Sequence, residues 1–112
     1  MRKPSTLLAS AVLLAGCASA GGHAPTSASG PGARPTASEI TALATLIRLE
    51  DRREWDEAAL QNLAASPSPL VRAHAALAAG RIGDKHATPL LTRMLADGDT
   101  TVAADAAFAL GL

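Results

Sequence analysis

Apolar and polar positions follow a helical period from Thr36 onward. In the first stretch the apolar residues recur every three or four positions, as on one face of a helix. They are Ile40, Leu43, Leu46 and Ile47. Thr36 and Glu39 fit a capping box, in which each side chain binds a backbone N–H of the other. The pattern predicts a lead-in helix within residues 36–53, reaching about Glu50 and followed by a charged turn or helix end.

The chain repeats itself from Asp56 onward, with a shift that places Leu60 on Leu91. The same shift aligns Val71 with Val102 and pairs four further positions of the second helix. These pairs are Ala76 with Ala107, Leu77 with Phe108, Ala78 with Ala109, and Gly80 with Gly111. Self-similarity at this period is typical of repeat architectures. We therefore predict two helix pairs, at residues 54–84 and 85–112, with the second one truncated.

Each predicted unit has an alanine-rich second helix that begins at Val71 or Val102. Small side chains allow two helix backbones to approach, and we expect Leu77 or Phe108 to fill the remaining gap. Leu77 is thus expected to be buried at the centre of the first unit. Gly80 and the Gly83-Asp84 pair are expected to end the helix, because glycine accepts the left-handed conformation at a helix C-terminus. No segment has the period-two pattern of a strand.

The run from Val71 to Asp84 resembles the short HEAT-like repeats of bacteria, also called phycobilisome-lyase-type repeats. The resemblance covers about residues 54–112. Its signature positions here are Val71, Arg72, Ala76, Leu77, Gly80, Gly83, Asp84, Val102, Ala107, Phe108 and Gly111. It implies an all-α fold, an α-solenoid of helix pairs. In the family the arginine tends to support the neighbouring turn, so the second unit, with Ala103 at this position, is expected to lack that ion pair.

The N-terminus has a different pattern: a basic start, Arg2-Lys3, and then an apolar run from Leu7 to Ala15. This order is typical of a secretory signal peptide, here residues 1–16, and the run is too short for a stable membrane span. The alternative is a buried N-terminal helix. The run ends in Leu14, Ala15, Gly16 and Cys17. These four residues resemble the lipobox of bacterial lipoproteins, and the resemblance implies cleavage before Cys17 and a multiply acylated, palmitate-type lipid on its sulfur.

Residues 17–35 connect this segment to the helices, and all but three of them are Ala, Gly, Ser, Pro or Thr. Such a composition cannot bury enough apolar surface to offset chain entropy, so we expect a disordered linker. Ala18 and Ser19 follow the cysteine, where the lipoprotein family uses aspartate for retention in the inner membrane. The resemblance therefore implies a periplasm-facing protein in the cell envelope, on the outer membrane where the cell has one.

Charge and chemistry narrow the choice of function. Ten basic and ten acidic residues give a formal charge of zero, and Trp55 and Phe108 are the only aromatic residues. Nucleic-acid binding therefore has neither a basic patch nor a stacking platform. The histidines, His23, His74 and His86, lack partners at metal-ligand spacing. No catalytic constellation, cofactor motif or small-molecule site is evident; Cys17 is the only cysteine and is assigned to lipid.

The combination predicts a membrane-anchored HEAT-repeat scaffold at the bacterial cell envelope that binds an unidentified protein partner. Two alternatives remain. The lead-in Leu49-Glu50-Asp51-Arg52-Arg53 followed by HEAT-like units resembles the N-terminal arm of certain lipoprotein peptidyl-prolyl isomerases. In these, a cyclophilin-type domain follows, and it would lie beyond residue 112. The second alternative is a purely structural envelope lipoprotein. We expect a longer parent protein rather than a complete small lipoprotein, because Phe108, Leu110 and Leu112 are expected to be exposed.

Overall fold

The computed structural model describes residues 32–112. Within that range it contains five helices and no strand. The helices are α1 (Ala37–Arg52), α2 (Glu57–Ala64), α3 (Pro69–Ile82), α4 (Ala87–Met94) and α5 (Thr100–Leu110). The predicted all-α class is therefore confirmed, with α2–α3 as the first helix pair and α4–α5 as the second.

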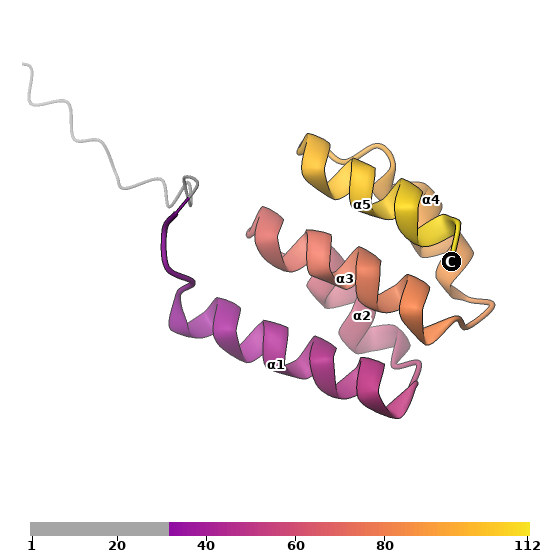
Figure 1. Ribbon diagram of the computed structural model, residues 1–112, viewed down its shortest axis with the longest axis horizontal. Coiled ribbons are helices and arrows are strands. Elements are labelled where there is room, and N and C mark those ends of the chain that lie inside the picture. The colour runs from indigo at the N-terminus through magenta and orange to yellow at the C-terminus, as the bar shows by residue number, and fades with distance from the viewer. Residues whose placement is uncertain (1–31) are drawn as a thin grey trace, which may run out of the picture.

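The helices form two layers (Figure 1). Helices α1, α3 and α5 lie side by side and run in the same direction, while α2 and α4 return in the opposite direction behind them. Helix α3 is central, because it contacts each of the other four helices. The order α1, α3, α5 places α1 at one end of the stack and α5 at the other.

Polar caps explain where the helices begin. The Thr36 N–H donates to Glu39 Oε2 at 2.7 Å, and the Glu39 N–H donates to Thr36 Oγ1 at 3.3 Å, which completes a capping box. Asp56, Ser68 and Asp99 accept backbone N–H groups at the starts of α2, α3 and α5. Helix α1 continues two residues past Glu50, and Arg53 ends it in a left-handed conformation with φ of 48°.

The core is made largely of small side chains. Five alanines of α3 are buried: Ala73, Ala75, Ala76, Ala78 and Ala79. The largest fully buried residues are Leu46, Leu60, Leu91, Val71 and Val102. These residues occupy the space between the helices, so the units pack by close backbone approach around a few large side chains.

Leu77 does not belong to this core, and the expectation of central burial was wrong. It is only partly buried and lies outside the core cluster, and its equivalent Phe108 is 61 % exposed. The reason is that alanines on the neighbouring positions of α3 already fill the helix contacts, which leaves Leu77 on the outward side. Neither side chain fills an inter-helix gap.

The buried face of α1 also differs from the expected one. Leu46 and Leu49 are buried, whereas Ile40 is 57 % and Ile47 is 59 % exposed. The two isoleucines are seven residues apart and so lie on one side of the helix, roughly opposite Leu49. Since α1 has a packed neighbour on only one side, just one of its two apolar sides can be covered.

Gly80 has a role other than the expected one. Helix α3 continues past it to Ile82, and Gly83, with φ of 71°, is the residue that ends the helix. A Cβ atom at position 80 would lie 2.8 Å from the Cβ of Ala109. Gly80 is therefore a point of close approach between α5 and the backbone of α3.

Candidate functional site

An ion pair joins the turns of the two units. Arg72 Nε donates to Asp97 Oδ2 at 2.8 Å and Arg72 Nη2 donates to Asp97 Oδ1 at 3.0 Å. Arg72 Nη1 also donates to the Ser66 carbonyl at 2.8 Å. Both side chains are mostly covered, at 18 % and 13 % exposure. The guanidinium therefore ties the α2–α3 turn to the α4–α5 turn; Ala103, at the same repeat position in α5, has no group that could do so.

This pairing shifts both ionisation equilibria. The hydrogen bonds from Arg72 hold the pKa of Asp97 below its usual value, although partial burial opposes the shift. The same hydrogen bonds raise the pKa of Arg72. The charged forms of both groups are thus favoured in the folded chain, as expected for a bidentate arginine–carboxylate pair.

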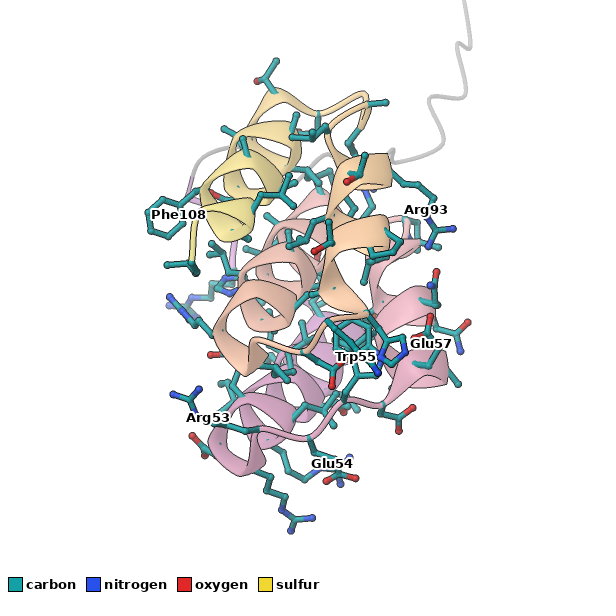
Figure 2. The ribbon with its side chains drawn as sticks, turned by 90° about the vertical axis from the view of Figure 1, so that its right-hand side faces the viewer. Arg53, Glu54, Trp55, Glu57, Arg93 and Phe108 are labelled. Carbon is teal, nitrogen blue, oxygen red and sulfur yellow. The ribbon has the colours of Figure 1, made fainter. Side chains whose placement is uncertain are left out.

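A second cluster of polar side chains crosses between the units on the side of α2 and α4 (Figure 2). Trp55 stacks on His86 with ring centroids 6.2 Å apart and 29° between the planes. Trp55 Nε1 donates to Glu57 Oε2 at 2.7 Å, and His86 Nδ1 lies 2.6 Å from Asp84 Oδ1. The shift that aligns the two units also places Trp55 on His86. The sequence repeat could therefore have predicted that these two residues lie near each other.

The cluster extends along α2 to α4. Gln61 Nε2 donates to Glu57 Oε1 at 2.7 Å, and Arg93 donates to Gln61 Oε1. The hydrogen bond from Gln61, and then that from Trp55, lowers the pKa of Glu57. The hydrogen bonds from the backbone and side chain of His86 lower the pKa of Asp84. These contacts hold the first helices of the two units together and leave their polar atoms open to solvent.

The open side of α3 and α5 is the third feature. A shallow hollow of about 300 Å³ lies between the N-terminal halves of the two helices. Its lining residues are Pro69, Leu70, Ala73, His74, Asp99, Thr101 and Asp105. Farther along α5, Phe108 projects away from the stack (Figure 2). This side therefore combines apolar and polar groups accessible to a partner, and we call it the outward side.

The fourth feature is a hollow of about 350 Å³ at the N-termini of α1 and α3. The Ser68 hydroxyl donates to Glu39 Oε1 at 2.5 Å across it. This hydrogen bond is the main reason why the pKa of Glu39 is lowered. Since the bond satisfies both side chains and joins two helix caps, it supports the packing of α1 on α3.

The predicted signature residues separate into three groups, apart from Leu77, which is partly buried on the outward side. Val71, Val102 and Ala76 are buried in the helix contacts, and Arg72, Gly80, Gly83 and Asp84 make the contacts and turns given above. Ala107, Phe108 and Gly111 are exposed on α5. The predicted lipobox residues Leu14, Ala15 and Gly16, and the predicted lipid site Cys17, lie outside the described residues.

Two further observations concern residues 32–112 alone. They contain no group of three or more His, Cys, Asp and Glu side chains placed to hold a metal ion. Among the helices α1 to α5, none is both long enough and apolar enough to cross a membrane.

Stacked antiparallel helix pairs, repeated at a constant period in the sequence, define a helical-repeat protein of the α-solenoid class. The model of the HEAT repeats family matches residues 33–111, which is more than half of the chain. The chain therefore belongs to the HEAT-repeat family, and the predicted HEAT-like resemblance is confirmed. No curated protein and no solved structure matches it significantly.

Proposed function

We propose that the protein is a lipid-anchored HEAT-repeat scaffold that binds a protein partner at the bacterial cell envelope. The observation that supports it best is the outward side of α3 and α5, which has a hollow lined by Leu70 and His74 and, farther along α5, the exposed Phe108. HEAT repeats commonly bind other proteins through surfaces formed by successive helices. An apolar surface rimmed by polar groups is typical of protein–protein contact sites.

The membrane part of the proposal rests on the sequence. The lipobox-like residues before Cys17 favour lipid attachment, and a multiply acylated cysteine gives stable anchoring where one acyl chain does not. Residues 18–35 separate the lipid from Thr36. A fully extended chain of that length spans at most about 60 Å. The repeats would therefore bind a partner within that distance of the membrane.

The anchor is tested by replacing the nucleophile. Cys17→Ser should abolish incorporation of a labelled fatty acid and leave the precursor uncleaved, because an alcohol is a much poorer nucleophile than a thiolate. Ser19→Ala is the matched control and should incorporate label as the wild type does. Equal label in wild type and Cys17→Ser would refute the anchor and leave the repeat assignment intact.

The binding surface is tested by site-specific photocrosslinking in the source bacterium. A photoreactive residue at Leu70 reports on the outward side, whereas one at Thr88 reports on the exposed side of α4. We expect a discrete crosslinked product from position 70 and none from position 88. Product from position 88 alone, or the same products from both, would refute the assignment of the outward side.

The second candidate function is the N-terminal arm of a lipoprotein peptidyl-prolyl isomerase. It rests on the lead-in 49–53, in which Leu49 is buried and Glu50 forms an ion pair with Arg81 at 3.1 Å. These contacts join the lead-in to the first unit as a continuous arm. The test is the genomic sequence downstream of residue 112: a cyclophilin-type domain there would support this function, and its absence would leave the scaffold.

A further inference from the structure

The hollow on the outward side lies between two consecutive units, with α3 of the first unit on one side and α5 of the second on the other. Two repeat positions contribute to it from both helices. Leu70 is equivalent to Thr101, and His74 is equivalent to Asp105. Both positions change residue type between the units, whereas the buried Val71 is again a valine in α5. Helix packing therefore accounts for the valines and does not account for the carboxylate in the hollow.

Two carboxylates, those of Asp99 and Asp105, line the hollow, and no lysine or arginine does. Asp99 has a structural role, because its Oδ1 atom accepts the N–H groups of Thr101 and Val102 at the start of α5. Asp105 lies within α5, is partly buried, and takes part in none of the three ion pairs formed within residues 32–112. A partly buried carboxylate loses some of its hydration, so a cation beside it would restore favourable interactions.

The α3 wall of the same hollow is largely apolar and is made by Pro69, Leu70 and Ala73. A long basic side chain matches such a combination, because its methylene stem packs along apolar surface while its charged end reaches a polar group. The apolar wall belongs to α3 and both carboxylates belong to α5. The hollow therefore offers separate surfaces for the stem and for the charge.

We propose that the hollow binds a lysine or arginine side chain of the protein partner, with the stem on Pro69 and Leu70 and the charged end at Asp105. The inference rests on the proposed function, in which the outward side receives a protein, and it adds the chemistry of the segment that binds there. Leu77 follows His74 by three residues on the same side of α3, so the segment should carry an apolar residue next to the basic one. Complementary charge of this kind selects among partners more than it adds affinity.

The test uses short peptides and therefore does not require the natural partner. The lysine probe is acetyl-Gly-Leu-Lys-Leu-Gly-amide, and two matched probes carry glutamine or glutamate in place of lysine. Each probe is titrated, up to about 5 mM to cover weak binding, into the isotope-labelled 112-residue chain. Amide chemical shifts measured by nuclear magnetic resonance locate the binding site.

The lysine probe should shift the amides of Leu70, Ala73 and Asp105. It should bind about two- to fivefold more tightly than the glutamine probe, which is the range expected from one partly exposed charge pair. The glutamate probe should bind more weakly than both, because its charge has the same sign as the carboxylates.

Two variants separate the charge from the packing. Asp105→Asn removes the charge and keeps the shape, and Thr101→Lys places a competing cation at the exposed edge of the hollow. Each should weaken the lysine probe about two- to fivefold and leave the glutamine probe unchanged. Thr88→Lys, on the exposed surface of α4, changes the net charge as Thr101→Lys does and should bind all probes as the wild type does. Circular dichroism verifies that each variant is helical.

Four outcomes overturn the inference. No probe shifts the amides of the hollow, or the lysine and glutamate probes bind equally well. Asp105→Asn and Thr101→Lys both bind the lysine probe as the wild type does, or Thr88→Lys weakens it as much as they do, which would indicate attraction to the chain as a whole. The proposed function fails separately: position 70 then gives no crosslinked product in the cell, although the lysine probe still binds selectively.

Discussion

Ala76 in the first helix pair is fully buried, and Ala107, its equivalent in the second pair, is exposed. A similar contrast separates Gly80, which is close to Ala109, from the exposed Gly111. Arg72 and Ala103 are both partly buried and differ in residue type, so only Arg72 can pair with Asp97. The two units share a sequence period, yet α3 has a helix on both sides and α5 has one on a single side. At the positions that face the following unit, the neighbour rather than the repeat position determines whether a residue is buried. Four predictions test this comparison.

The largest effect is expected at Leu60, which is 0 % exposed in the core of the first unit. Leu60→Ala should lower the free energy of unfolding by about 2–5 kcal/mol, because it removes buried methyl groups and leaves a cavity. Leu77→Ala, on the outward side of the same unit, should cost less than half as much. Urea titrations followed by circular dichroism measure both. If both variants lost the same free energy of unfolding, Leu77 would have to be buried in the core, which would contradict its partly exposed position on α3.

The next effect concerns the ion pair between the turns. Arg72→Ala should lower the free energy of unfolding by about 1–3 kcal/mol, since it removes charge-assisted hydrogen bonds and leaves a mostly covered carboxylate unpaired. Ala103→Arg, the reciprocal change in the second unit at a partly exposed position, should change it by less than about 0.5 kcal/mol, as substitutions outside the core usually do. If Arg72→Ala lowered the free energy of unfolding by no more than Ala103→Arg changes it, the ion pair would not couple the two turns.

The same pair predicts a pH dependence. Because the pKa of Asp97 is lowered in the folded chain, its contribution is fully present above its unfolded-state value, about 3.9. That contribution is lost as the pH falls through the lower folded-state pKa. Other carboxylates with lowered pKa values act in the same direction, so the comparison is with Asp97→Asn, whose stability should fall less steeply between about pH 5 and 2. The exposed Asp51→Asn is the control and should follow the wild type.

The smallest net effect is expected at the glycines. Gly80→Ala places a Cβ atom 2.8 Å from Ala109, whose backbone must then shift. We expect a loss of about 1 kcal/mol, because overpacking outweighs the gain in helix propensity. At Gly111 the nearest atom to an added Cβ is the Phe108 carbonyl oxygen at 3.4 Å, so Gly111→Ala should be neutral or slightly stabilising. Thermal unfolding distinguishes the two, and equal melting temperatures would contradict the close approach of α5.

Much of the fold could be predicted from the sequence, since caps and turns are local. Thr36, Ser68 and Asp99 precede their helices directly, and the sequence repeat aligns the units. The buried faces were harder to predict. An alanine-rich helix such as α3 is apolar on every side, so its pattern does not distinguish Ala76 from Leu77. Helix α1 likewise has two apolar sides, and which one is covered depends on a neighbour distant in the sequence.

The polar contacts also differ in how far they could be predicted, because they join residues that are distant in the sequence. Arg72 was expected to support a neighbouring turn only through the family resemblance, and its partner Asp97 is 25 residues away. The cluster around Trp55 was not predicted, although the repeat shift places Trp55 on His86, because equivalent positions in the sequence do not by themselves show that the two rings stack. The lipid site at Cys17 remains a prediction from the sequence alone.

Trp55 is the only tryptophan of the chain, and it lies where the first unit touches the second. Its emission therefore reports optically on the boundary between the units, without any introduced label, whereas circular dichroism reports on all helices together. If the units unfold as one cooperative block, the two signals change at the same denaturant concentration. If α4 and α5 detach first, the indole loses His86 and its emission changes while most of the helical signal remains. The molecule thus contains its own probe of how far a short solenoid behaves as a single cooperative structure.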